Sequence, residues 1–200
     1  MVSLDREAKH TPPPCKMRIT PDSRPRILVL PGSRCSPVEQ EAHRGFQSFW
    51  ASWADPAWSA VWYEGIPWHG AAIHRWLTQT GEFAGGWIVV AFSAGVVGAL
   101  GLASLHPHLL GVIAWDGWCV PLRLPCRVSR LSHDLATHQN GWWWGQGQAQ
   151  FYADPFVDHL QLWRDPRQVE GWIYPSGASS SAVRGTASHF LKMQLAILSD

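Results

Sequence analysis

Hydrophobic residues in this chain gather in short runs that are separated by polar and glycine-rich stretches. Continuous apolar runs of this length, bounded by turn residues, are typical of strands that are buried on both faces of a parallel sheet. We predict strands over residues 26–30, 59–63, 86–92, 111–116, 127–132 and 150–153.

Segments with helical patterns lie between these strands. The clearest begins at Ser36, which can cap a helix, with Pro37 at the first helical position and Glu39 completing a capping box. This helix is expected to run to about Trp53. Further helices are predicted over about 70–80, 94–105, 166–174 and 189–199, with Gly81 as a stop. Alternating strands and helices predict an α/β fold: a mostly parallel sheet with helices on both faces, a three-layer sandwich.

The domain organisation is expected to be simple. Residues 1–25 are polar and proline-rich, which predicts a disordered N-terminal lead-in. Residues 26–200 suffice for a single domain with a sizeable core, and residues 175–187 are expected to form a Gly/Ser-rich connector.

Charge and cysteine content limit the partners and the compartment. The net charge of +1 gives no support to a nucleic-acid or anionic-membrane partner. No apolar run reaches 18 residues, so no membrane span is expected. The first residues have no apolar central segment, so no secretory signal is expected either. The four cysteines, irregularly spaced, are expected to be reduced thiols of a cytoplasmic protein; a Cys119–Cys126 disulfide or metal pair is the alternative.

The segment from Ile88 to Leu100 carries the strongest chemical signal. An apolar strand breaks at Ala91-Phe92-Ser93-Ala94-Gly95 and continues as a small-residue helix. A strand, a sharp turn and a helix with serine at the apex form a nucleophile elbow, in which the positions flanking the serine by two must be small. We therefore predict Ser93 as a nucleophile exposed at the carboxyl edge of the sheet.

With this elbow and an earlier strand and glycine turn, Leu28-Val29-Leu30-Pro31-Gly32, the chain resembles a small α/β-hydrolase over residues 26–174. The resemblance implies a serine esterase or lipase-like hydrolase without a lid domain, since the gap between Ser93 and Asp134 leaves little room for one. It also implies that the glycine turn contributes to an oxyanion hole.

The same resemblance implies a catalytic acid and base in the order Ser93, Asp134, His159. Asp134 follows a later strand, where the family places its acid. His159, followed by Pro166 and Val169, resembles the histidine loop of the family. A departure is Asp158, where the family more often has glycine.

Both assignments have rivals in the sequence. Asp116, which ends the strand after the elbow helix, is the alternative acid, whereas Asp158 is too close to His159 to be the default one. The alternative bases are His189, which opens a late helix, and His133 and His138.

The expected reaction needs each of these residue types. A neutral imidazole removes the serine proton as the serine attacks a carbonyl, and a carboxylate holds the imidazole in the right tautomer. Preset backbone N–H groups stabilise the oxyanion, and we expect those of Ala94, Gly32 and Ser33 to do so. The expected function is hydrolysis of a carboxylic ester or thioester through an acyl-enzyme.

The chain has fourteen tryptophans, of which some are expected to pack in the core and several to line a surface cleft or contact a partner. We expect residues 141–148 to be a loop, because the segment is too rich in glycine for a helix. This loop either places Trp142, Trp143 and Trp144 near the mouth of the site or folds them back onto the core. Phe92 and Trp118 complete the expected substrate contacts. An apolar or aromatic ester is the expected substrate. A non-catalytic protein that binds a ligand or partner through this surface is the alternative, and the oligomeric state stays open.

No cofactor or metal is expected from sequence motifs. No glycine-rich phosphate loop or dinucleotide fingerprint is present. His106 with His108, or His133 with His138, would be candidate ligands, but neither pair has the spacing of a known metal motif.

Overall fold

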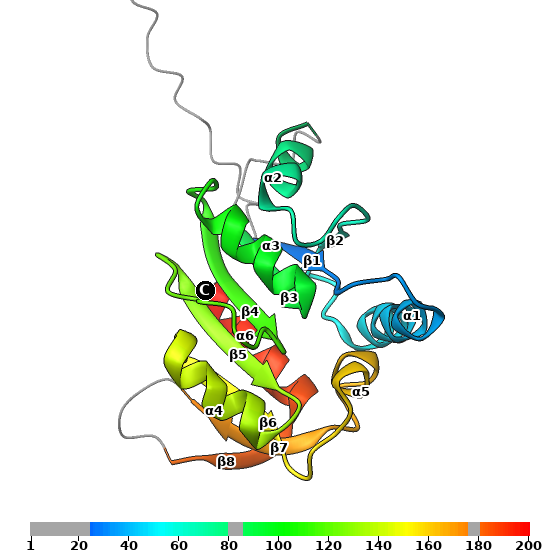
Figure 1. The fold of residues 1–200 in the computed structure, drawn as a ribbon, viewed down its shortest axis with the longest axis vertical. Coiled ribbons are helices and arrows are strands. Elements are labelled where there is room, and N and C mark those ends of the chain that lie inside the picture. Colours follow the sequence, from blue (N-terminus) through cyan, green and yellow to red (C-terminus); the bar gives the residue numbers. More distant parts are fainter. Residues whose placement is uncertain (1–24, 80–85, 176–180) are drawn as a thin grey trace, which may run out of the picture.

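The computed structural model describes residues 25–79, 86–175 and 181–200, and within them an eight-stranded sheet in the order β2-β1-β3-β4-β5-β6-β7-β8 (Figure 1). The strands are β1 (Arg26–Leu30), β2 (Ala60–Trp62), β3 (Trp87–Phe92), β4 (Leu109–Trp115), β5 (Arg127–Ser132), β6 (Ala149–Ala153), β7 (Glu170–Tyr174) and β8 (Val183–Thr186). Strands β2 to β6 pair in parallel, and β7 and β8 add an antiparallel edge. The predicted α/β class with a mostly parallel sheet is confirmed.

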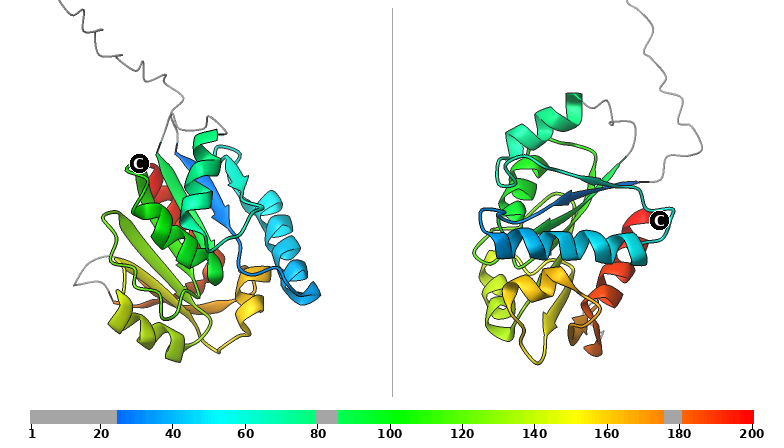
Figure 2. Two further views of the ribbon diagram at one scale, coloured as in Figure 1. Left: turned by 45° about the horizontal axis from the view of Figure 1, so that its top comes forward. Right: turned by 90° about the vertical axis from the view of Figure 1, so that its right-hand side faces the viewer.

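Helices cover both faces of this sheet (Figures 1 and 2). They are α1 (Pro37–Trp53), α2 (Gly70–Gln79), α3 (Ala94–Ala103), α4 (Leu135–Trp144), α5 (His159–Arg164) and α6 (Ala187–Ser199). Helices α2 and α3 pack on one face, where α4 also lies over β5 and β6, and α1, α5 and α6 pack on the other. Figure 2 shows α1 and α5 side by side.

Alternation along each strand divides the buried side chains between two cores. In β1, Ile27 and Val29 face the α1/α5/α6 side, while Leu28 and Leu30 face the α2/α3 side. All four are fully buried, because successive side chains of a strand point to opposite faces and both faces are covered. This explains why the strands appear in the sequence as continuous apolar runs.

The predicted start of α1 is confirmed in detail. The backbone N–H of Glu39 donates to Ser36 Oγ at 3.2 Å, and the backbone N–H of Ser36 donates to Glu39 Oε2 at 2.8 Å. This reciprocal pair satisfies two donors that an unpaired helix end would leave free, and Pro37 occupies the first helical position.

Many of the tryptophans fill the core beneath α1 and α5. Trp163 of α5 stacks on Phe46 of α1, with ring centroids 3.6 Å apart, and Trp115 of β4 meets Trp163 edge-on at 5.4 Å. Trp50 and Trp62 pack in the same cluster. Large aromatic rings thus join α1 and α5 to the sheet. The tryptophans of this cluster pack the core and do not line a binding surface.

Two predicted elements near the C-terminus are wrong. Residues 166–174 do not form a helix: the helix is α5, which ends at Arg164, and Glu170–Tyr174 is strand β7. The predicted connector contains strand β8, which pairs with β7. Gly171 and Gly185 face each other across this pair, and such small positions carry little β signal in the sequence.

The predicted loop over residues 141–148 is also wrong in its first half, because α4 continues to Trp144. Of the three glycines in this segment, only Gly141 lies within the helix, where it is buried beside the Arg130 side chain. Gly145 and Gly147 lie beyond the helix end with φ angles of 99° and 75°, which glycine adopts readily. The glycines therefore end this helix instead of preventing it.

Some expectations fall outside the described residues: the lead-in up to residue 24, the helix stop at Gly81, and Cys15. Cys35, Cys119 and Cys126 are free thiols. Across the ranges that the structure describes, no helix has the length and apolarity needed to cross a membrane.

His43 of α1 gives a stability prediction. Its ring is buried against Trp62, and within the described residues neither ring nitrogen has a hydrogen-bond partner. Burial lowers the pKa of His43, as does the nearby Arg34 charge. Below a pH of about 6.5 the unfolded chain takes up a proton that the folded state resists, so folded stability falls as the pH drops.

We therefore expect His43→Leu to raise the free energy of unfolding by about 1 kcal/mol at pH 7.5 and by more at pH 5.5. Urea unfolding at both pH values measures this. His189→Gln, which removes an exposed imidazole instead of a buried one, is the matched control. An equal or smaller gain at pH 5.5 would contradict the assignment.

Candidate functional site

Ser93 lies in a strained turn between β3 and α3. Its backbone has φ 50° and ψ −117°, a conformation that costs a non-glycine residue free energy. The turn is tied to the next strand by the Ser93 N–H, which donates to the Trp115 carbonyl at 2.8 Å. A Cβ at Gly95 would lie 2.5 Å from the Leu30 carbonyl oxygen, so this turn packs closely against the end of β1 and needs glycine there.

The glycine turn after β1 lies beside Ser93, as the sequence predicted. A Cβ on Gly32 would sit 3.1 Å from Ser93 Cβ and 2.8 Å from the Phe92 ring. Within the described part of the chain, the backbone N–H groups of Gly32, Ser33 and Ala94 form no hydrogen bond with another residue. Free donors next to Ser93 are what an oxyanion would need.

Asp116 follows β4 as Ser93 follows β3. The two strands pair with Phe92 opposite Trp115. Ser93 and Asp116, which directly follow these two residues, are therefore neighbours at the carboxyl edge of the sheet. Asp116 is 1% exposed, has φ 51°, and its N–H donates to the Leu131 carbonyl at 2.8 Å. A second strained residue therefore stands next to the first at the carboxyl edge.

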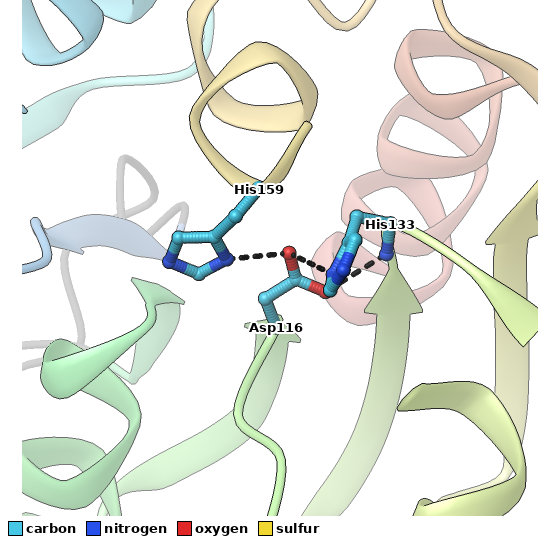
Figure 3. A group of neighbouring side chains, drawn as sticks. All are labelled: Asp116, His133 and His159. Carbon is cyan, nitrogen blue, oxygen red and sulfur yellow. Dashed lines mark hydrogen bonds and ion pairs between the residues drawn. The ribbon is translucent and has the colours of Figure 1, made fainter. Parts of the chain in front are cut away.

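Two histidines converge on the Asp116 carboxylate (Figure 3). His159 Nδ1 lies 2.8 Å from Asp116 Oδ2, and His133 Nδ1 lies 3.0 Å from the same oxygen. The His133 backbone N–H donates to Oδ1 at 2.8 Å. The buried carboxylate is thus paired at both oxygens, as a buried charge requires.

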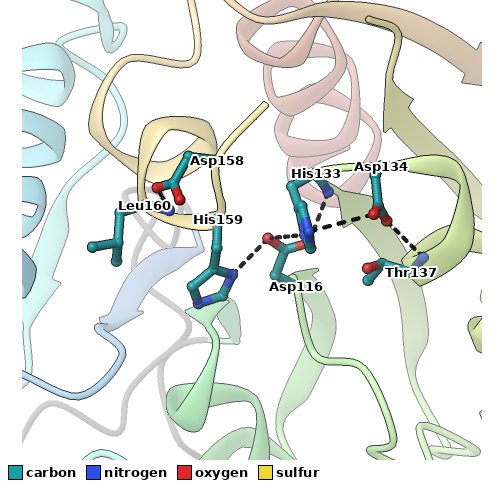
Figure 4. Close-up of polar contacts among 7 residues, drawn as sticks. All are labelled: Asp116, His133, Asp134, Thr137, Asp158, His159 and Leu160. Atoms are coloured by element: carbon teal, nitrogen blue, oxygen red, sulfur yellow. Dashed lines mark hydrogen bonds and ion pairs between the residues drawn. The ribbon is translucent and has the colours of Figure 1, made fainter. Parts of the chain in front are cut away.

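The contacts of His133 continue outward to Asp134 (Figure 4). His133 Nε2 lies 3.6 Å from Asp134 Oδ2. The hydrogen bond to Asp116 raises the pKa of His133, against an opposing effect of burial, and the charges of Asp116, Asp134 and Asp158 add to the increase. This imidazole lies between two carboxylates that favour its protonated form.

Asp134, the predicted acid, does not contact His159. It is the N-cap of α4, where its Oδ1 accepts the Thr137 N–H at 2.7 Å. The carboxylate that meets His159 belongs instead to Asp116, the alternative. The reason is sheet order: β4 lies next to β3, whereas β5, which leads to Asp134, is one strand further away.

His159, the predicted base, is the first residue of α5, and its side chain is 33% exposed. Asp158 caps this helix, with Oδ1 accepting the Leu160 N–H at 2.9 Å, which explains an aspartate at that position. The imidazole stacks on Phe92 at 4.6 Å, and Phe92 stacks in turn on Trp163 at 4.9 Å. Phe92 is therefore a buried support for the imidazole rather than an exposed substrate contact.

Arg130 supports the loop after Asp116. This buried guanidinium donates to the carbonyls of Gly117 at 3.1 Å, Val120 at 2.7 Å and Trp144 at 3.3 Å. Burial lowers its pKa to about 10, which leaves it charged at neutral pH. One side chain of β5 thus fixes the backbone beside the carboxylate and the end of α4.

The other predicted residues lie elsewhere. His189 is exposed beside β8, five strands from β3 in the sheet order, and His138 is buried on α4, stacked with Tyr174. Trp142 and Trp143 are exposed near the C-terminal end of α4 and line a shallow depression with Ala136, Gln139 and Asn140. This end of α4 leads back toward the start of β6, away from the carboxyl edge. Trp118 is exposed two residues after Asp116.

Sequence reasoning missed the pairing of His133 with Asp116, and it missed Arg130. From the sequence, His133 is a candidate only as an alternative base or, with His138, as a metal ligand. No spacing rule identifies these residues, because their partners come from neighbouring strands.

Asp116 and the two histidines that contact it form a potential metal-binding group. Asp116, His133 and His159 each offer one ligand atom, and these atoms lie within 4.8 Å of one another. Of the two histidine pairs that the sequence offered as ligands, His106 with His108 and His133 with His138, only His133 belongs to this group.

The sequence matches no protein-family model, and no curated protein is significantly similar to it. Function has therefore to be inferred from the site itself.

The strain at Ser93 gives a testable prediction. Glycine adopts positive φ without the steric cost that a Cβ imposes, although it loses more chain entropy on folding. We expect Ser93→Gly to unfold with a free energy about 1 kcal/mol higher than Ser93→Ala, which keeps the Cβ. Both variants remove the hydroxyl, so their difference in urea unfolding isolates the backbone. Equal stabilities, or a less stable Ser93→Gly, would contradict the prediction, because the relieved strain would then not exceed the entropy cost of glycine.

Proposed function

We propose that this protein is a serine hydrolase, a small α/β-hydrolase without a lid domain, which cleaves carboxylic esters or thioesters through an acyl-enzyme. Its triad is Ser93, His159 and Asp116. The observation that carries the proposal is that two strained residues, Ser93 and Asp116, lie side by side at the ends of β3 and β4. Ser93 lies beside free backbone donors, and the buried carboxylate of Asp116 holds the partly exposed imidazole of His159, with Oδ2 2.8 Å from Nδ1.

In the first step, Ser93 Oγ attacks the substrate carbonyl carbon while His159 takes the hydroxyl proton. Since Nδ1 of His159 faces Asp116, the nitrogen that accepts this proton is Nε2. Asp116 keeps the proton on Nδ1 and stabilises the imidazolium that forms. Its burial strengthens this interaction, because little water screens the charge.

The tetrahedral oxyanion is stabilised by the N–H of Ala94, at the amino end of α3, and by an N–H of the Gly32–Ser33 turn. When the intermediate collapses, the proton on His159 Nε2 passes to the leaving alcohol or thiol. Water then attacks the acyl-enzyme by the same route in reverse, and the acid leaves with Ser93 restored.

Exposed apolar side chains near the triad support an apolar acyl group. Trp118 is 61% exposed two residues after Asp116, and Phe156 is 79% exposed three residues before His159. Both belong to loops that follow strands at the carboxyl edge. An apolar ester such as p-nitrophenyl butyrate is therefore a suitable first substrate.

Two conservative variants test the choice of acid. Asp116→Asn should lower kcat/KM for p-nitrophenyl butyrate by about 10³–10⁴, because an amide favours the wrong imidazole tautomer. Asp134→Asn is the matched control: asparagine also caps helices, so activity should stay within about twofold. Ser93→Ala and His159→Gln should reduce hydrolysis to background.

The reverse pattern, with Asp134→Asn inactive and Asp116→Asn active, would overturn the assignment of the acid. Hydrolysis that persists in Ser93→Ala would overturn the nucleophile. A folded wild type that binds apolar esters without turnover would instead favour a non-catalytic binding protein.

A further inference from the structure

A serine triad needs one imidazole on its carboxylate, yet Asp116 has two. His159 accounts for the base, and the contact of His133 Nδ1 with the same oxygen at 3.0 Å is left without a role in the reaction. The second ring comes from the loop after β5, and its side chain is 25% exposed, so small solutes can reach it.

We infer that Asp116, His133 and His159 bind a divalent transition-metal ion, with Zn²⁺ as the best-suited class of ion, and that this ion competes with the serine chemistry. The effect on catalysis rests on the proposed function; the binding itself does not. Two imidazole nitrogens and one carboxylate oxygen, with a fourth position left for water, are a common ligand set for Zn²⁺.

The distances are close to what such a site requires. Bonds of about 2.0–2.1 Å place neighbouring ligand atoms of a tetrahedral ion about 3.3 Å apart. Asp116 Oδ2 lies 2.8 Å from one Nδ1 and 3.0 Å from the other, and all three atoms lie within 4.8 Å of one another. Shifts of a few tenths of an ångström in the carboxylate, with a rotation of the partly exposed rings, would admit the ion.

Outer contacts support the same arrangement (Figure 4). A metal-bound histidine usually directs its second ring nitrogen to a carboxylate, and His133 Nε2 lies 3.6 Å from Asp134 Oδ2. The Asp116 carboxylate is itself oriented by the His133 backbone N–H on Oδ1. These contacts orient the Asp116 carboxylate and place the outer nitrogen of the His133 ring near a second carboxylate.

Metal binding would switch off His159 as a base. An ion on Nδ1 requires the ring to carry its single proton on Nε2, and any second proton is released to solvent. Nε2 is the atom that must accept the Ser93 proton, so a metal-bound His159 cannot do so. Zn²⁺ should then inhibit reversibly, and removal of the ion by a chelator should restore activity.

Titration calorimetry with Zn²⁺ at pH 8 tests the site without relying on catalysis. We expect one ion per chain, and at least about tenfold weaker binding for His133→Gln. The exposed His189→Gln is the matched control and should bind as the wild type does. Ser93→Ala should also bind normally, which separates the metal site from the nucleophile. Co²⁺ should give the visible absorption of a tetrahedral site in wild type but not in His133→Gln.

The second arm measures p-nitrophenyl butyrate hydrolysis against Zn²⁺ concentration, each variant relative to its own metal-free rate. Inhibition should need at least about tenfold more Zn²⁺ in His133→Gln than in wild type. Absence of binding in wild type, or binding that His133→Gln leaves unchanged, would overturn the site. Binding without inhibition in an active enzyme would overturn the competition. If no hydrolysis is detected at all, calorimetry still decides the metal site, and only the proposed function fails.

Discussion

The parallel pairing of β3 with β4 is the constraint on which the candidate site depends. Because Phe92 stands opposite Trp115, the residues that follow them, Ser93 and Asp116, are neighbours at the carboxyl edge. Both have positive φ angles, which among the described non-glycine residues only Cys119 shares. The two strand ends thus hold a hydroxyl and a carboxylate in conformations that cost free energy, and strain of this kind persists where packing enforces it.

The aromatic core completes the arrangement by holding the third group. A stack of rings runs from Phe46 on α1 through Trp163 on α5 and Phe92 on β3 to His159. It fixes the plane of the imidazole from one side while Asp116 fixes its Nδ1 from another. Several of the tryptophans therefore serve to position α5 and His159 against the sheet.

The sequence predicted the features that depend on local chemistry. The strands of the parallel sheet, the capping box at Ser36 and the turn at Ser93 all follow from residues close together in the chain, and the structure contains each of them. Strands β7 and β8 were missed because they pair antiparallel at an edge, where small and polar positions weaken the pattern. The carboxylate that contacts His159 could not be chosen from the sequence, since Asp116 and Asp134 both follow strands and only the sheet order distinguishes them. Asp134 in turn serves α4 as a cap, a role that the sequence allows equally well.

Covalent labelling tests whether Ser93 is the activated nucleophile that we propose. Folded wild-type protein is exposed to a fluorophosphonate at neutral pH, and the modified peptide is mapped by mass spectrometry. We expect one label per chain, on Ser93, at a rate that falls steeply in Asp116→Asn and is retained in Asp134→Asn. A folded wild type that stays unlabelled at Ser93 would contradict it.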